Sequence, residues 1–175
     1  MKDFEEQLAS LLASYGIPPD YFSSRAIPRQ AEATELESIG PDIFGREQQL
    51  APAAAQAWRA MQAAAEADGV ALLVVSAFRS VQRQCALFER KLEAGQSCEE
   101  ILRVSMAPGF SEHHTGRALD IATPGCPPLV EAFADTPAFQ WLSQSAARFG
   151  FSLTYPRDNP YGVVYEPWHW AFTRA

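Results

Sequence analysis

Residues 111–122, SEHHTGRALDIA, contain two of the three histidines of the chain and an aspartate inside an apolar segment. The last six residues alternate as a β-strand does, which puts Leu119 and Ile121 on one face and Asp120 on the other. An ionised carboxylate in such a strand is costly unless it is paired or binds a metal. Two interpretations of Asp120 follow: a salt bridge or backbone cap, or a metal ligand.

His113 favours the metal interpretation, because imidazole and carboxylate are both good zinc ligands. Gly116 lies between the two and suits a tight bend or a close backbone approach. Adjacent histidines on an extended segment point apart. We therefore expect His113 to be a ligand, and His114 to be a bystander or to lie just outside the ligand set.

The third histidine lies in residues 165–172, YEPWHWAF. Alternation after the proline puts Trp168 and Trp170 on one face of a strand and His169 on the other. Two histidines and one aspartate leave the fourth position of a tetrahedral zinc ion open for water, which is typical of catalytic zinc. We therefore expect one zinc ion bound by His113, Asp120 and His169.

Glu166 is the candidate general base for such a site. Because it precedes Pro167, its backbone is biased toward extended conformations, and a kink at the proline could bring its carboxylate beside His169. A glutamate that is not a ligand can take a proton from the attacking water and return it.

The order of predicted elements indicates the fold class. We expect helices over residues 3–16, 51–68, 81–95, 98–104 and 136–150, and strands over 70–78, 117–122, 151–155 and 163–172, with 33–39 as a further short strand. This order has no regular βαβ alternation and favours an α+β fold. We expect a single domain over 1–175, with a central antiparallel or mixed sheet flanked by helices, a motif-bearing core at 71–172 and a helical and loop extension at 1–50 that packs on it.

Composition narrows the possible partners. The net charge is −7 and no cluster of Lys or Arg occurs, which argues against nucleic acid. No run approaches the roughly 18 apolar residues that a membrane helix needs. The first residues carry acids where a secretory signal has a basic leader, so we expect a cytoplasmic monomer, with the periplasm or cell envelope as the alternative.

The three cysteines share no metal-binding spacing. Cys85 falls on a helical stripe with Val81 and Phe88, so we expect a buried, unreactive side chain there rather than a catalytic thiol.

Three motifs together resemble the VanY-like D-alanyl-D-alanine carboxypeptidases: SAFRS at 76–80, PGFSEHHTGRALD at 108–120 and YEPWHW at 165–170. These zinc peptidases share a superfold with the VanX-type dipeptidases and the N-terminal domain of sonic hedgehog. The resemblance implies that His113, Asp120 and His169 bind zinc and that Glu166 is the base. It also implies that Arg79 polarises the scissile carbonyl or stabilises the oxyanion, and that Ser111, Gln84 and Ser80 contribute to substrate binding.

Each of the last four residues has a structural alternative. Arg79 could form a surface ion pair, Ser111 a turn, Gln84 an exposed polar position on a helix, and Ser80 a helix cap. The sequence also departs from the common family pattern, since Ala77 and Phe78 replace Gly and Tyr, and His114 stands where glutamine is frequent.

The resemblance implies release of a C-terminal D-alanine from peptidoglycan stem peptides or muropeptides, by D,D- or L,D-carboxypeptidase action. The alternatives are a D-Ala-D-Ala dipeptidase, a peptidoglycan endopeptidase, and a catalytically silent peptidoglycan-binding module.

Overall fold

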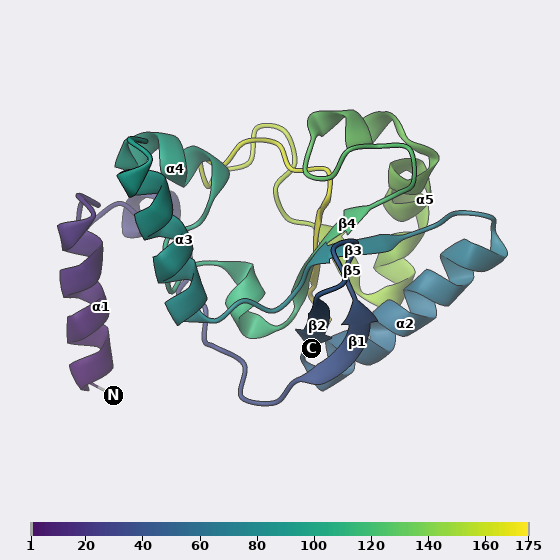
Figure 1. The fold of residues 1–175 in the computed structure, drawn as a ribbon, viewed down its shortest axis with the longest axis horizontal. Helices are drawn as coiled ribbons and strands as arrows, with labels where there is room; N and C mark the ends of the chain where they lie inside the picture. The colour runs from purple at the N-terminus through teal and green to yellow at the C-terminus, as the bar shows by residue number, and fades with distance from the viewer. Residues whose placement is uncertain (1, 175) are drawn as a thin grey trace.

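The computed structural model describes residues 2–174, and within them the chain forms an α+β fold (Figure 1). The helices are α1 (Lys2–Ser14), α2 (Pro52–Ala67), α3 (Val81–Glu93), α4 (Cys98–Val104) and α5 (Pro137–Ser145). The strands are β1 (Glu37–Pro41), β2 (Glu47–Leu50), β3 (Leu73–Ser76), β4 (Ala118–Ala122), β5 (Phe151–Leu153) and β6 (His169–Phe172).

The main sheet has the order β3-β4-β6-β5, and every neighbouring pair is antiparallel. The expected central sheet is therefore confirmed and is antiparallel rather than mixed. A separate hairpin pairs β1 with β2. Figure 1 shows α2 and α5 beside the sheet, whereas α1, α3 and α4 gather on the other side of the molecule.

Local signals explain where the helices begin. Pro52 occupies the first turn of α2, where a missing N–H costs nothing. The Ser80 hydroxyl accepts a hydrogen bond from the Arg83 N–H at the start of α3. Ser97 and Glu100 form a reciprocal capping box at the start of α4. The residues that make up each signal lie within a few positions of one another, so the sequence alone predicts where these helices begin.

Two apolar clusters form the core. The first cluster joins α2, α5 and the main sheet, with Trp58, Leu119 and Trp170 among its buried members. The second cluster joins the segment after α1 to α3 and α4, with Ile17, Phe88 and Ile101 among its buried members. In the described chain, no helix is both long and apolar enough to cross a membrane.

Three expectations need correction. Residues 163–167 form a loop rather than a strand: the Val164 N–H bonds to Arg103 O and the Glu166 N–H to Tyr155 O, so neither joins the sheet. The predicted helix over 136–150 ends as a short 3₁₀ helix, Ala146–Phe149. Cys85 is half-buried rather than buried, because the α3 positions facing the core are those of Gln84 and Phe88.

Candidate metal centre and active-site cavity

Strand register brings two of the expected ligands together. Asp120 in β4 lies directly opposite His169 in β6. Residues opposite one another in neighbouring strands have their side chains on the same face of the sheet. Accordingly, Asp120 Oδ1 lies 3.1 Å from His169 Nδ1. The alternation predicted for both segments therefore accounts for this half of the site.

The third ligand comes from the 3₁₀ helix Glu112–Thr115, which precedes β4. His113 Nε2 lies 3.4 Å from Asp120 Oδ2, and the Nδ1–H of the same ring donates to Ala77 O at 2.7 Å. This second bond fixes the ring and leaves the Nε2 lone pair facing the aspartate.

Gly116 makes the bend between His113 and Asp120. Its φ is +63°, and a Cβ there would lie 2.9 Å from the backbone nitrogen of Ala51. Both expected reasons for a glycine, a tight bend and a close backbone approach, are therefore present, and the bend is left-handed.

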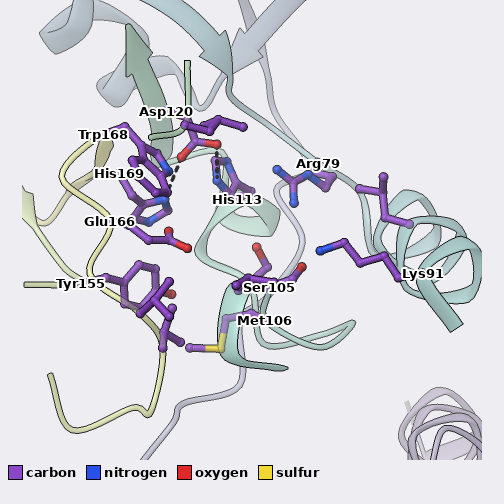
Figure 2. Close-up of a pocket in the computed structure, with 16 residues that line it drawn as sticks. Arg79, Lys91, Ser105, Met106, His113, Asp120, Tyr155, Glu166, Trp168 and His169 are labelled. Carbon is purple, nitrogen blue, oxygen red and sulfur yellow. Dashed lines mark hydrogen bonds and ion pairs between the residues drawn. The ribbon is translucent and has the colours of Figure 1, made fainter. Parts of the chain in front are cut away.

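The three ligand atoms fit a single zinc ion. The ligand atoms of His113, Asp120 and His169 all lie within 4.8 Å of one another, and all three residues are buried (Figure 2). Zinc ligands at about 2.0–2.1 Å in a tetrahedron are separated by about 3.4 Å, which matches the two short contacts. The donor set of two imidazoles and one carboxylate is also one that zinc prefers.

The charges of these groups are strongly coupled. Burial raises the pKa of Asp120, but the contacts with His113 and His169 outweigh burial and hold that pKa well below its usual range. Burial lowers the pKa of His169, whereas its hydrogen bonds to Asp120 and Glu112 raise it to about 10. The carboxylates thus make the site strongly attractive to a cation.

Glu112 was not predicted as a site residue. Its Oε2 accepts a hydrogen bond from His169 Nε2 at 2.8 Å and another from the Thr154 hydroxyl at 2.7 Å. A carboxylate on the outer nitrogen of a metal-binding histidine orients the ring and increases its basicity. The only signal in the sequence is an acid next to an expected ligand, because the contact spans 57 residues.

Glu166 lies at the turn that leads into β6. The His169 N–H bonds to Glu166 O across Pro167 and Trp168, so the expected kink is present. The Glu166 side chain lines the same cavity as the three ligands (Figure 2). Burial raises the pKa of Glu166 to about 7. A carboxyl with such a pKa is suited to accept and return a proton near neutral pH.

Arg79 reaches the cavity from the loop between β3 and α3. Its Nη1 donates to Gln84 Oε1 at 2.9 Å and its Nη2 donates to Ser76 Oγ at 3.2 Å. Burial lowers the pKa of Arg79, and Asp120 opposes that shift. The guanidinium is therefore held in place by neutral acceptors and does not form the surface ion pair considered above.

Gln84 is fully buried, and it does not line the cavity. Its Nε2 donates to Met106 O at 2.6 Å and to Ser105 Oγ at 3.0 Å. The alternative of an exposed position is wrong for Gln84, whereas its contact with substrate stays a prediction. Its bonds join Arg79 to the segment after α4, which makes it a positioning residue.

The two serines differ. Ser80 caps α3 and does not line the cavity, so the structure favours the cap over the predicted role in substrate binding. Ser111 lines the cavity, and its hydroxyl has no hydrogen-bond partner within the described residues. Ser111 is therefore free to bond a ligand, and its role in substrate binding stays a prediction.

His114 lies outside the ligand set, as expected, but it is fully buried. Its Nδ1–H donates to Arg79 O at 2.6 Å, and its Nε2 accepts from the Gly109 N–H at 3.0 Å. Its role is to join two loops that border the cavity.

The cavity has a volume of about 410 Å³. One side is formed by the metal ligands, Glu166 and Tyr155, and α3 contributes Leu87 and Lys91. The segment after α4 adds Ser105 and Met106. A space of this size and polarity accommodates the end of a peptide.

Comparison with known proteins identifies the family of the chain. The sequence pattern of the VanY family, described as D-alanyl-D-alanine carboxypeptidase, matches residues 47–175. The chain therefore belongs to the VanY family of D-alanyl-D-alanine carboxypeptidases. It is 32% identical over 170 residues to YodJ of Bacillus subtilis (strain 168), and 32% identical over 119 residues to a D-alanyl-D-alanine carboxypeptidase of Enterococcus faecalis (strain ATCC 700802 / V583).

These matches cover 94% and 62% of the chain, but only 59% of YodJ and 42% of the Enterococcus protein. Among solved structures, the LdcB LD-carboxypeptidase superposes with a TM-score of 0.73 at 30% identity, over 83% of this chain and 71% of that one. VanYB in complex with D-alanine-D-alanine gives a TM-score of 0.66 at 28% identity, over 85% and 81%. A mutant of the D,D-pentapeptidase VanY in complex with Zn(II) gives 0.63 at 28% identity, over 85% and 83%.

Proposed function

We propose that this protein is a zinc-dependent carboxypeptidase that releases C-terminal D-alanine from peptidoglycan stem peptides. One observation carries the proposal: Glu166, whose pKa is raised to about 7, lines the same cavity as the three ligands but is not one of them. A binding module has no need of a general base beside its metal. The similarity to LdcB, and to VanY proteins solved with D-alanine-D-alanine or Zn(II), supports the same reaction.

Different residues would carry out different steps of amide hydrolysis. Zinc, when bound, supplies a Lewis acid that polarises the carbonyl and makes water more acidic. Glu166 takes a proton from the attacking water as its oxygen bonds to the carbonyl carbon, and then delivers that proton to the nitrogen as the C–N bond breaks. The Arg79 guanidinium stabilises the negative charge that develops on the carbonyl oxygen.

The Glu166→Gln variant tests this division. We expect kcat/KM to fall by about 10²- to 10⁴-fold, since a general base contributes this much. Zinc content by elemental analysis and the thermal unfolding midpoint should match the wild-type protein, because glutamine is nearly isosteric and Glu166 is not a ligand. A folded, zinc-loaded variant with wild-type activity would refute the proposal.

A panel of stem peptides defines the substrate. Release of D-alanine, measured by mass spectrometry, from a pentapeptide ending in D-Ala-D-Ala indicates D,D-carboxypeptidase action, and release from a tetrapeptide indicates L,D-carboxypeptidase action. Free D-Ala-D-Ala tests the dipeptidase alternative, and cross-linked dimers test the endopeptidase alternative. Zinc and peptide binding without turnover on any member would favour the binding module.

A further inference from the structure

Lys91 is a cation in the cavity wall that the motifs do not include. It lies on α3, seven positions after Gln84 and four after Leu87, so the helix presents all three on one face. Lys91 and Leu87 both line the cavity. Figure 2 shows the Lys91 side chain extending from α3 toward the middle of the cavity.

The Lys91 ammonium makes no direct contact with a partner among the described residues. It forms no hydrogen bond or ion pair with any described residue, whereas Arg59 and Arg157 on the surface each pair with a glutamate. Lys91 is half-buried; burial and the nearby Arg79 lower its pKa, and the Glu166 carboxylate opposes that shift without contacting the ammonium. A partly desolvated cation beside a second cation is unfavourable unless an anion joins them.

The carboxylates and the cations that line the cavity come from different segments of the chain. Asp120 and Glu166 line the cavity on the side of the ligand set, whereas Arg79 and Lys91 come from the loop before α3 and from α3 itself. Within the described residues, the Arg79 guanidinium donates only to neutral acceptors, those of Ser76 and Gln84. A ligand that brings its own carboxylate to the α3 side would complete the pairing.

Hydroxyl groups beside this cationic side also suit an anion. Ser105 Oγ accepts a bond from Gln84 Nε2, which leaves its own O–H to donate into the cavity. The Ser111 hydroxyl has no partner in the described chain. One ammonium and two hydroxyl donors are a suitable set for a carboxylate.

We propose that Lys91 binds the C-terminal carboxylate of the substrate and thereby makes the enzyme select a chain end over an internal peptide bond. The inference rests on the proposed function, because the reacting carbonyl must lie at the ligand set. The terminal carboxylate lies one residue beyond that carbonyl. A substrate with its carbonyl at the ligand set can therefore direct this group toward the α3 side.

The test compares charge on the enzyme with charge on the substrate. The substrates are an N-acylated peptide ending in D-alanine and the same peptide ending in D-alaninamide, and release of the last residue is followed by mass spectrometry. For Lys91→Met we expect kcat/KM on the free acid to fall about 10- to 100-fold, mainly through KM, as for a lost charged hydrogen bond. On the amide we expect less than about threefold change, since the amide offers no charge to lose.

Two further variants serve as controls. Lys91→Arg should retain most of the preference for the acid, because it keeps the charge. Arg90→Met removes the same charge from the adjacent exposed position of α3, and should leave both substrates within about twofold of wild type. Equal losses on acid and amide in Lys91→Met, or a loss no larger than that of Arg90→Met, would overturn the proposal.

A third substrate distinguishes the source of the carboxylate. The peptide for this comparison has a side-chain carboxylate on the residue before the terminal D-alanine. In the altered substrate, the terminal carboxylate is kept and that side-chain carboxylate is replaced by an amide. If the loss in Lys91→Met follows this side chain instead of the chain end, the assignment to the terminal carboxylate is wrong.

A binding experiment separates this inference from the proposed function. Calorimetry on zinc-loaded Glu166→Gln, with and without Lys91→Met, gives Kd for the acid and the amide without turnover. If the wild-type protein hydrolyses neither peptide, the proposed function fails, but a preference for the acid that Lys91→Met abolishes would still support the role of Lys91. Equal Kd values for acid and amide in Glu166→Gln would refute it.

Discussion

Replacement of His114 tests whether this buried imidazole is a structural tie. His114→Ala would leave Arg79 O and the Gly109 N–H without their partners at 2.6 and 3.0 Å. Each buried group left unpaired costs about 1–3 kcal/mol. With partial relaxation of the loops, we expect the free energy of unfolding to fall by about 3 kcal/mol.

Chemical denaturation measures this free energy directly. For a chain of this length, each kcal/mol corresponds to roughly 2–4 °C, so the thermal midpoint should fall by about 6–12 °C. His114→Asn keeps a donor near the position of Nδ1 but has nothing at the position of Nε2, and we expect about half the loss. An unfolding free energy for His114→Ala within about 0.5 kcal/mol of wild type would show that the two bonds do not stabilise the fold.

The pH dependence of stability provides a second measurement. Burial lowers the pKa of His114, and the hydrogen bond to Arg79 opposes this shift without cancelling it. Below about pH 6.5 the unfolded chain therefore binds a proton that the folded imidazole does not, so this residue costs stability as the pH falls. We expect the loss of unfolding free energy between about pH 7 and pH 5 to be smaller in His114→Asn than in the wild-type protein.

Two further predictions concern the metal and the base. Glu112→Ala removes the carboxylate from His169 Nε2, and we expect zinc affinity to fall about 10- to 100-fold in a competition titration with a chelating dye. Glu93→Gln removes the same charge at an exposed position and serves as the control. Equal zinc affinities for the two variants would contradict the role of Glu112. Glu166 must be ionised to accept a proton, so kcat/KM should fall as the pH decreases through the pKa of Glu166. Because a bound cation lowers that pKa from the value of about 7, the midpoint of the fall should lie below pH 7. A pH profile in which kcat/KM does not fall at low pH would contradict Glu166 as the base.

The sequence predicts those parts of the site that depend on local pattern. Period-two alternation predicts that Asp120 and His169 lie opposite the apolar faces of their strands, and the structure has them on the same face of the sheet. Pro167 predicts the turn at Glu166. Helix signals such as Ser97 with Glu100 also lie within one turn and predict α4 over Cys98–Val104.

The sequence could not predict contacts between distant segments. Gln84 looks like a surface residue on a helix, and only its packing against the Met106 carbonyl and Arg79 shows that it is buried. Glu112 and His169 are brought together by the sheet and the loop before β4, and no local spacing predicts that pair. The sequence did not predict strand β2, because Glu47–Leu50 carries three polar residues in succession. Its hydrogen-bonded pairing with β1 holds it as a strand, although its composition does not favour one.

The two apolar clusters of the core support different parts of the cavity. The metal ligands Asp120 and His169 lie in strands that pack in the first cluster, whereas Lys91 lies in α3, which packs in the second, and Ser105 directly follows α4. If Lys91 selects the chain end as proposed, substitutions on the cavity-facing side of α3 will alter which chain ends are accepted while the strands that hold the metal keep their register. On that proposal, selectivity and hydrolysis depend on different parts of the core, and substrate preference can change without rebuilding the metal centre.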